Sequence, residues 1–301
     1  MVLVRVTAEP RRGTVVASIA VGRPFGPYEI RDVLGKGASS TVFIGRRSDE
    51  VDVAVKVLST FAMGNADFRA AVPREFNALN KVVHPNVIAV EKMGTIADVL
   101  FIELEWVDGP TLDQSMTIGK PLGLKTAIEI AIGVADALDA CHQAGVVHRD
   151  VKPSNILLRS EESPVLFDFG LAQDAENPDC LPGRLYATPM TAAPEQVAAE
   201  GMIDGRADVY ALGVTLFRMV SGKLPFYGER MDLLRMHAER EPPSLRSINK
   251  TCPESIEGVI LKALQKSPDD RFQTAAGFAE ALRALPDEDL ETAKRRGIFR
   301  R

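Results

Sequence analysis

The sequence has few cysteines, few aromatic residues and no excess of positive charge. Its three cysteines, Cys141, Cys180 and Cys252, are far apart and form neither a CxxC pair nor a metal-ligand spacing. This usage favours a reducing cytoplasm and small buried thiols over disulfides or a zinc site. The formal net charge is −5, so there is no general basic surface, and nucleic acid is not expected as the main partner.

Long hydrophobic runs are also missing. No apolar stretch is long enough to span a bilayer, and the first 21 residues contain three arginines and no continuous apolar core, unlike a signal peptide. Basic residues cluster at 294–296 and 300–301. Two interpretations of this tail stay open: a solvated end, or a segment that lies beside a membrane. The expected location is the cytoplasm, either free or as the cytoplasmic part of a membrane-attached protein.

The 301 residues suffice for one large domain or for two lobes. Apolar and β-branched patterns predict strands at 28–34, 40–46, 51–58, 87–94 and 99–106, with a short helix at 74–82 and a β-hairpin within 2–21. Helical spacing then predicts helices at 126–144, 208–220, 254–266 and 274–285, the first ending at Gly145 and the second at Gly222. A β-rich part followed by a helical part indicates an α+β protein with two unlike lobes.

A glycine-rich stretch, LGKGASSTV at 34–42, lies between two predicted strands. Glycines let the backbone approach phosphate oxygens and offer N–H donors to them. Taken alone, the stretch fits a plain hairpin turn equally well. A Rossmann site is disfavoured because that site needs a helix after the loop.

Lys56 lies in the apolar stretch Val53-Ala54-Val55-Lys56. A buried ammonium must be paired, and Glu75 on the next helix is the candidate partner; the alternative is a lysine on the solvent face of an edge strand. Pro73 predicts that this helix begins near residue 73 and does not extend back to Asp67. A mobile helix that controls activity through the Lys56–Glu75 pair is the other interpretation.

The stretch HRDVKPSN at 148–155 carries the strongest chemical signal. Asp150 can accept the hydrogen of a substrate hydroxyl, Lys152 can neutralise phosphate charge, and Asn155 can hold a metal ion. Asp168 follows a predicted strand and precedes Gly170 by two residues, and a carboxylate there suits Mg²⁺ that bridges phosphates.

Together these motifs resemble a eukaryotic-type (Hanks-type) protein kinase, closest in texture to the bacterial Ser/Thr kinases, over about residues 25–285. The resemblance implies a bilobal α+β kinase fold, with the active site in the cleft near the Glu105–Val107 hinge. It divides the chain into an N-terminal extension (1–24), a β-rich N-lobe (25–106), a mainly helical C-lobe (107–285) and a basic tail (286–301).

The resemblance also assigns roles. Asp150 would be the base, Lys152 would support the γ-phosphate, Lys56 would contact phosphates while paired to Glu75, and Asn155 with Asp168 would bind Mg²⁺ or Mn²⁺. The residues implied for ATP binding are Leu34, Gly35, Lys36, Gly37, Ala38, Ser39, Ser40, Val42, Ala54, Lys56, Leu104, Glu105, Val107 and Leu157.

Further implied contacts concern the helical lobe. Glu195, in Ala193-Pro194-Glu195, would pair with Arg271, and Asp208 would brace the catalytic loop. Lys152 with Thr188 implies Ser/Thr rather than Tyr specificity. The implied activity is transfer of the γ-phosphate of Mg-ATP to protein hydroxyls.

The sequence departs from the family pattern at several positions. Ser40 replaces the third glycine of the loop, and Thr191 with Ala192 replaces common residues of the substrate-binding segment. Between Gly170 and Thr188 there is no Ser or Thr, and Tyr186 is the sole hydroxyl. The usual phosphothreonine switch against Arg149 therefore has no acceptor.

Fixed acids offer a replacement for that switch. We hypothesise that Arg149 pairs with Asp174, Glu176 or Asp179, or that an activating partner or a homodimer orders the segment; a solvated acidic loop is the alternative. Two other functions stay open: a pseudokinase that acts as a binding module, and a small-molecule kinase of related fold. Retention of all five catalytic and metal-binding side chains argues against the first, and the Glu195–Arg271 framework argues against the second.

Overall fold

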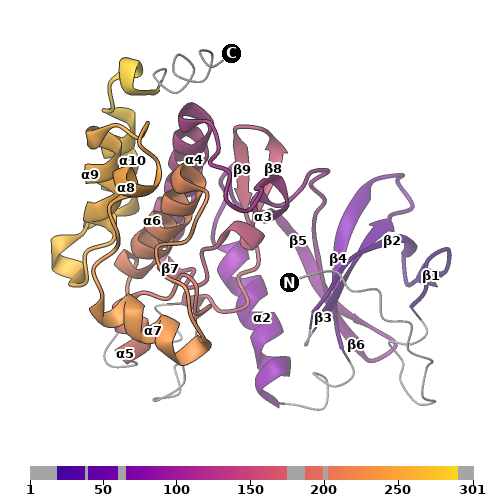
Figure 1. Cartoon of the computed structure of the whole chain (residues 1–301). Coiled ribbons are helices and arrows are strands. Elements are labelled where there is room, and N and C mark those ends of the chain that lie inside the picture. Colours follow the sequence, from indigo (N-terminus) through magenta and orange to yellow (C-terminus); the bar gives the residue numbers. More distant parts are fainter. Residues whose placement is uncertain (1–18, 38–39, 60–65, 175–186, 199–202, 291–301) are drawn as a thin grey trace. The chain divides into compact units, whose positions relative to one another are not determined.

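The computed structural model describes residues 19–37, 40–59, 66–174, 187–198 and 203–290 (Figure 1). The chain divides into two compact units, one comprising Met1–Phe76 and Val90–Trp106 and the other comprising Asn77–Ala89 and Val107–Arg301.

The first unit is built on one six-stranded antiparallel sheet. Its strands, in spatial order, are β1 (Pro24–Phe25), β2 (Tyr28–Lys36), β3 (Ser40–Arg46), β4 (Asp52–Leu58), β6 (Val99–Glu105) and β5 (Val90–Ile96). The strands predicted at 28–34, 40–46, 51–58 and 99–106 are confirmed within two residues at each end. The strand predicted at 87–94 begins later, at Val90, and ends at Ile96.

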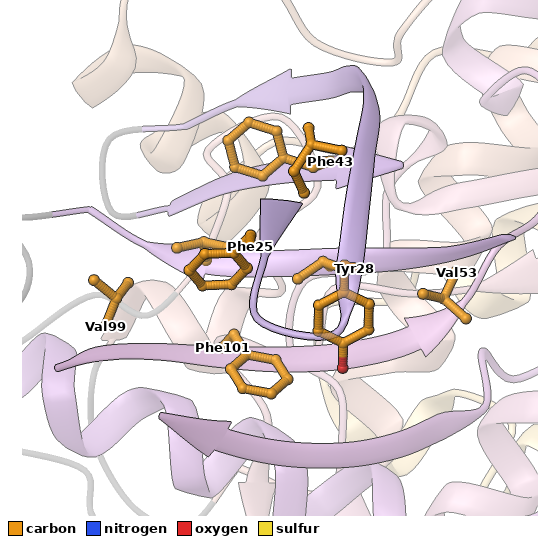
Figure 2. Packing of buried hydrophobic residues seen from close by; sticks show 9 residues of the cluster. Phe25, Tyr28, Phe43, Val53, Val99 and Phe101 are labelled. Atoms are coloured by element: carbon orange, nitrogen blue, oxygen red, sulfur yellow. The ribbon is translucent and has the colours of Figure 1, made fainter. Parts of the chain in front are cut away.

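The core of this unit lies on one face of the sheet, as Figure 2 shows. Alternate residues of β3 and β4 point to this face, so Phe43 lies opposite Val55 in the register. The ring of Phe101 meets those of Phe25 and Tyr28 edge-on, with centroids 6.1 and 5.7 Å apart. These rings pack with the β-branched side chains of the strands, and together they form one apolar layer.

The same face carries a buried acid, Glu103, that the sequence did not predict. The Glu103 carboxylate is fully buried and accepts hydrogen bonds from the hydroxyl of Tyr28 and from Arg47 and Lys92, the last two at 3.0 Å each. Burial alone would raise the pKa of Glu103, but these three donors together lower it. Glu103 therefore stays ionised inside the layer.

Helix α2 (Ala66–Asn80) corrects one prediction. The helix was expected to begin near Pro73, yet it runs from Ala66, before Asp67, with Pro73 in its interior. Proline lacks the N–H that would bond four residues back, at a cost of about 3 kcal/mol. Burial of Val72, Ala78 and Leu79 on the same helix offsets this local penalty.

The second unit is mainly helical. Its helices are α3 (Leu112–Ser115), α4 (Leu124–Gln143), α5 (Pro194–Ala198), α6 (Arg206–Ser221), α7 (Arg230–Glu239), α8 (Leu245–Ile248), α9 (Glu254–Ala263) and α10 (Ala275–Arg283). Helix α4 packs against α6 and α10, and α6 also packs against α9 (Figure 1). Helix α6 is buried around almost its whole circumference, as expected for a central helix.

The four predicted helices are confirmed with small boundary shifts; the helix predicted at 254–266 ends early, at Ala263. Gly145 and Gly222 have φ values of 75° and 72° at the ends of α4 and α6, as their predicted capping role requires. Helices α3, α5, α7 and α8 were not predicted. Of the hairpin predicted within 2–21, residues 19–21 form no strand, and the rest lies outside the described residues.

Two predicted buried thiols are confirmed. Cys141 and Cys252 are free and buried, and burial raises the pKa of both thiols, that of Cys252 to about 11. They are core residues and not nucleophiles. Cys180 lies outside the described residues.

Gly109 has no room for a side chain. A Cβ atom there would lie 1.9 Å from the Leu158 carbonyl oxygen, which the backbone holds in place. We expect Gly109→Ala to lower the free energy of unfolding by about 3 kcal/mol, because the backbone of one segment must move. Urea denaturation followed by circular dichroism measures this change.

Gly258→Ala provides the matched control. Gly258 lies inside α9, and a Cβ atom there meets nothing within 4 Å. This variant should raise the free energy of unfolding by about 0.5–1 kcal/mol, because alanine favours a helix interior. Equal effects of the two substitutions would contradict the steric argument.

Candidate active site

Hydrogen bonds to one buried acid hold the loop that carries Asp150. Asp208, on α6, accepts hydrogen bonds from the backbone N–H groups of His148 at 2.9 Å and Arg149 at 2.7 Å. Arg149 has φ 67°, an unfavourable value for a non-glycine residue that these bonds help to maintain. The predicted bracing role of Asp208 is confirmed.

The charge of Asp208 is itself stabilised. The side chain is fully buried, which alone would raise its pKa, but the hydrogen bond from His142 at 2.8 Å and the neighbouring His148 lower it overall. The acid therefore stays ionised and keeps both backbone N–H groups of the loop oriented.

Three side chains converge on the Asp150 carboxylate. Lys152 Nζ donates to Oδ2 at 2.6 Å, Thr188 donates its hydroxyl hydrogen to Oδ1, and Asn155 Nδ2 donates to Oδ2 at 3.1 Å. Lys152 also donates to the Thr188 hydroxyl oxygen at 2.8 Å. A carboxylate offers about four lone-pair sites, so this arrangement fixes the orientation of Asp150 and leaves capacity for a further donor.

The two predicted metal ligands come from adjacent strand ends. Asn155 immediately precedes β8 (Ile156–Ser160), which pairs with β9 (Ser163–Leu166), and the Phe167 N–H donates to the Asn155 carbonyl oxygen at 3.0 Å. Asp168 follows with φ 64°. The side-chain N–H₂ group of Asn155 faces Asp150, so the side-chain amide oxygen, Oδ1, is the atom suited to a cation.

The donor set fits a hard divalent cation. One carboxylate and one amide oxygen suit Mg²⁺, which takes few protein ligands and completes its shell with water and phosphate oxygens. The described part of the chain contains no group of three or more His, Cys, Asp or Glu that could hold a metal.

The predicted pair on the first unit is present. Lys56 Nζ donates to both Glu75 carboxylate oxygens, at 2.6 and 2.8 Å. Glu75 is 4% exposed and Lys56 side-chain exposure is 18%. The Lys56 ammonium is therefore partly accessible to solvent, and the buried Glu75 carboxylate balances its charge.

The sheet face that bears Lys56 also bears three other residues predicted to bind ATP. Val42 lies opposite Lys56 in the register, and Ala54 lies opposite Leu104. Residues directly opposite share a face, so these four point away from the aromatic core of Figure 2. The structure therefore brings them together as one apolar patch beside an ammonium.

The other residues predicted to bind ATP fall into three groups. Gly35 and Lys36 are in β2 with Leu34, which is 48% exposed, and the Gly37 N–H bonds to the Ser40 carbonyl oxygen at 2.8 Å. Ala38 and Ser39 lie outside the described residues. Glu105 ends β6 in the first unit, whereas Val107 and Leu157 belong to the second unit.

The predicted Glu195–Arg271 pair is also confirmed. Arg271 donates to both Glu195 carboxylate oxygens, at 2.7 and 2.8 Å, and its side chain is fully buried. Its guanidinium also donates to three backbone carbonyl oxygens, those of Arg206, Gln265 and Lys266. This bidentate pair ties the start of α5 to the segment before α10.

The comparison with protein families agrees with this geometry. The family described as "Protein kinase domain" matches residues 28–283. The chain belongs to the protein kinase family. Members of this family use ATP and a divalent metal ion, and they act on proteins.

Several curated bacterial kinases are similar to this chain. The chain is 35% identical to serine/threonine-protein kinase Pkn1 of Myxococcus xanthus over 300 residues, which covers 96% of this chain and 43% of Pkn1. It is 34% identical to PknJ of Mycobacterium tuberculosis, covering 88% of this chain and 46% of PknJ. With PrkC of Bacillus subtilis the identity is 31%, with 90% and 42% covered. The chain spans less than half the length of these relatives.

A solved structure shares the fold. The kinase domain of Mycobacterium tuberculosis PknI, as a C20A mutant, matches with a TM-score of 0.69 and 29% identity, covering 88% of this chain and 98% of that one. The predicted resemblance to bacterial Hanks-type kinases and the bilobal α+β kinase fold are thereby confirmed. Within the residues that the structure describes, no helix is both long and apolar enough to cross a bilayer.

Several residues around the kinase site escaped sequence analysis. Gln196 accepts from the Ala193 N–H at 2.9 Å and donates to the Arg149 carbonyl oxygen at 3.0 Å, which joins α5 to the catalytic loop. His142 and His237 are the other two. Their partners lie tens of residues away, so spacing along the chain gives no signal.

The proposed replacement for the phosphothreonine switch stays a prediction. Glu176 and Asp179 lie outside the described residues. Asp174 ends β10 (Gln173–Asp174), whose backbone pairs with β7 (Val146–Val147) three residues before Arg149. This pairing brings the backbone of the segment beside the catalytic loop.

Proposed function

We propose that this chain transfers the γ-phosphoryl group of ATP to serine or threonine hydroxyls of protein substrates. The observation that carries the proposal is the Asp150 carboxylate, oriented at once by the Lys152 ammonium and the Thr188 hydroxyl. Phosphoryl transfer needs positioning and charge stabilisation more than covalent participation by the protein. The residues of this centre supply both.

Asp150 acts on the acceptor side. Its carboxylate accepts the hydrogen of the acceptor hydroxyl and aims the oxygen at the terminal phosphorus. Lys152, 2.6 Å from the same carboxylate, carries the positive charge that offsets the developing charge on the transferred phosphoryl group. The Thr188 bond fixes the carboxylate plane, so that the acceptor meets it in one orientation.

Lys56 acts on the nucleotide side. Its ammonium binds phosphate oxygens, and Glu75 holds it by a bond to each carboxylate oxygen. The patch of Val42, Ala54 and Leu104 on the same sheet face provides apolar contacts for the adenine ring. A bound Mg²⁺ ion supplies charge neutralisation of the phosphates, with Asn155 and Asp168 as its protein ligands; Mn²⁺ fits the same oxygen donors.

A protein acceptor is favoured over a small alcohol. Arg271 and Glu195 fix the start of α5, directly after Thr188–Ala193, which is the stretch an extended acceptor would lie against. Thr188 beside Lys152 supports Ser/Thr specificity. We further propose that activation does not use phosphothreonine between residues 171 and 187, since that stretch has no Ser or Thr.

One assay tests the transfer and the mode of activation. The purified chain is treated with a phosphatase, the phosphatase is removed, and [γ-³²P]ATP is added with Mg²⁺ and a mixture of generic protein substrates. We expect label on serine and threonine of the proteins, at the rate of an untreated sample. Small alcohols and aminoglycosides, in parallel reactions, should take up no label.

Each other outcome has a definite meaning. No labelling of any protein by either sample would overturn the kinase proposal and favour a pseudokinase. Labelling by the untreated sample alone would retain the kinase and overturn the proposal on activation. Label on an aminoglycoside in place of proteins would assign a small-molecule kinase.

A further inference from the structure

A buried histidine outside the chemistry described above contacts the segment that follows Thr188. His237, on α7, is fully buried, and both ring nitrogens have partners. Nε2 lies 3.1 Å from the Met190 carbonyl oxygen, and Nδ1 lies 2.9 Å from the Tyr210 hydroxyl. A histidine buried this completely, with two specific partners from two other segments, requires an explanation.

The partners define the state of the ring. A carbonyl oxygen only accepts, so Nε2 must carry the hydrogen and donate it to Met190. Nδ1 of the neutral ring is then an acceptor, and the Tyr210 hydroxyl donates to it. Burial and the nearby Lys266 ammonium lower the pKa of His237 to about 4, which keeps the ring neutral.

Aromatic rings and charged side chains pack around the imidazole. Phe226 meets it edge-on at 5.0 Å between centroids, and Tyr210 does so at 5.8 Å. Lys266 Nζ donates to the His237 carbonyl oxygen at 2.8 Å and lies over the rings of both Tyr210 and Phe226. The guanidinium of Arg271, which holds Glu195, lies over the Tyr210 ring at 4.9 Å. His237 therefore belongs to the same rigid cluster as the Glu195–Arg271 pair.

Met190 belongs to a turn that begins at the catalytic centre. The Thr191 N–H donates to the Thr188 carbonyl oxygen at 3.0 Å, which closes a turn over 188–191. The first residue of this turn, Thr188, bonds to Asp150 and Lys152. The third, Met190, gives its carbonyl oxygen to His237 while its side chain is 44% exposed. One turn thus links the base to an apolar side chain that faces solvent.

We propose that His237 is a positioning residue for the protein acceptor: through the Met190 carbonyl oxygen it fixes the turn that presents Thr188 to Asp150 and the Met190 side chain to the acceptor chain. The inference rests on the proposed kinase function. It assigns to His237 a contribution to acceptor binding, and to the Met190 side chain a preference for an apolar residue close to the acceptor hydroxyl.

The test separates acceptor binding from nucleotide binding. His237→Phe keeps the aromatic volume and removes both hydrogen bonds, whereas His237→Gln keeps an N–H donor near the Nε2 position. Steady-state kinetics on a protein acceptor identified for the wild-type chain give KM for the acceptor, KM for ATP and kcat. We expect His237→Phe to raise KM for the acceptor at least about fivefold, since a buried carbonyl loses its donor, with KM for ATP changed less than twofold. His237→Gln should recover most of the loss.

Arg235→Gln is the matched control. Arg235 lies on the same helix, and its side chain is 76% exposed and paired with Glu239 one turn away. This variant should change none of the three constants by more than twofold. Thermal unfolding of each variant gives the folded fraction at the assay temperature.

The outcomes distinguish a positioning role from a structural one. A purely structural histidine would lower kcat through loss of folded enzyme and leave both KM values unchanged, which would overturn the inference. An equal rise of both KM values would also overturn it. If His237→Phe does not fold, Tyr210→Phe decides: it removes the hydroxyl that donates to Nδ1 of His237, so an unchanged acceptor KM in this variant would contradict the proposal. If the wild-type chain labels no protein, the proposed function fails first, and the inference falls with it.

Discussion

Asp150→Asn should reduce the rate of phosphoryl transfer to a protein acceptor by about 10²–10⁴-fold. Asparagine has nearly the same shape, but its amide oxygen is too weak a base to take the proton of the acceptor hydroxyl, and the amide carries no charge to orient Lys152. Single-turnover transfer of ³²P from ATP, with enzyme in excess over the acceptor, measures the chemical step directly. A variant rate above one tenth of the wild-type rate would remove Asp150 from its proposed role.

Two accompanying measurements show whether the loss is chemical. The affinity for ATP should change less than about threefold, because Asp150 acts on the acceptor side and its partners, Lys152, Asn155 and Thr188, all belong to the second unit. Asp136→Asn serves as the control, since Asp136 pairs with Arg283 at the surface. Such exposed pairs contribute little, so the control should keep the wild-type rate and thermal unfolding midpoint.

Lys56→Met should lower kcat/KM for ATP by roughly 10²–10³-fold, the usual effect of removing one donor that stabilises transition-state charge. Glu75→Gln should lower it by about tenfold, because a neutral amide holds the ammonium less firmly than a carboxylate. The two substitutions act on one ion pair with bonds of 2.6 and 2.8 Å. The double variant should therefore be no worse than Lys56→Met alone.

This double-mutant cycle has a direct test and a control. Initial rates at several ATP concentrations give kcat/KM for the four forms. Fully additive losses would show that Lys56 and Glu75 act independently, which would contradict the pair, and unchanged turnover in Glu75→Gln would discard it. Glu29→Gln is the control on the same sheet, since Glu29 is 53% exposed and pairs only loosely with Arg31 at 3.1 Å.

The sequence alone indicated that Asp150, Lys152 and Asn155 lie close together, because they are near one another along the chain. All three lie within the six positions 150–155, and a short loop between a helix and a strand restricts how their side chains can meet. The strands of the first unit could also be predicted from the sequence. Successive side chains of a strand point to opposite faces of the sheet, so strands such as β3 and β4 leave a recognisable residue pattern.

Pro73 shows how a correct local rule gave a wrong boundary. Proline does disfavour a helix interior, and on that ground the helix was expected to start there. Val72, Ala78 and Leu79 of α2 are buried, and their packing outweighs one missing hydrogen bond. A propensity describes an isolated segment, whereas the fold is decided by the sum of all contacts.

The supports of the site needed the tertiary structure. His142 reaches Asp208 across 66 residues, Gln196 reaches Arg149 across 47, and His237 reaches Met190 across 47. Gln196 and His237 are buried, and His142 is half-buried. Spacing along the chain cannot identify such partners, because only the packing of distant segments brings them together.

By itself, the sequence determined which groups are available for phosphoryl transfer and which strands and helices carry them, because residue type and short-range periodicity are written along the chain. Only the tertiary structure decided which of these groups are oriented. Asp208 orients the catalytic loop through two backbone N–H groups, and His237 donates to the Met190 carbonyl oxygen. The physical reason is that orientation depends on buried hydrogen bonds between distant segments, and these form only when the core has brought the segments together.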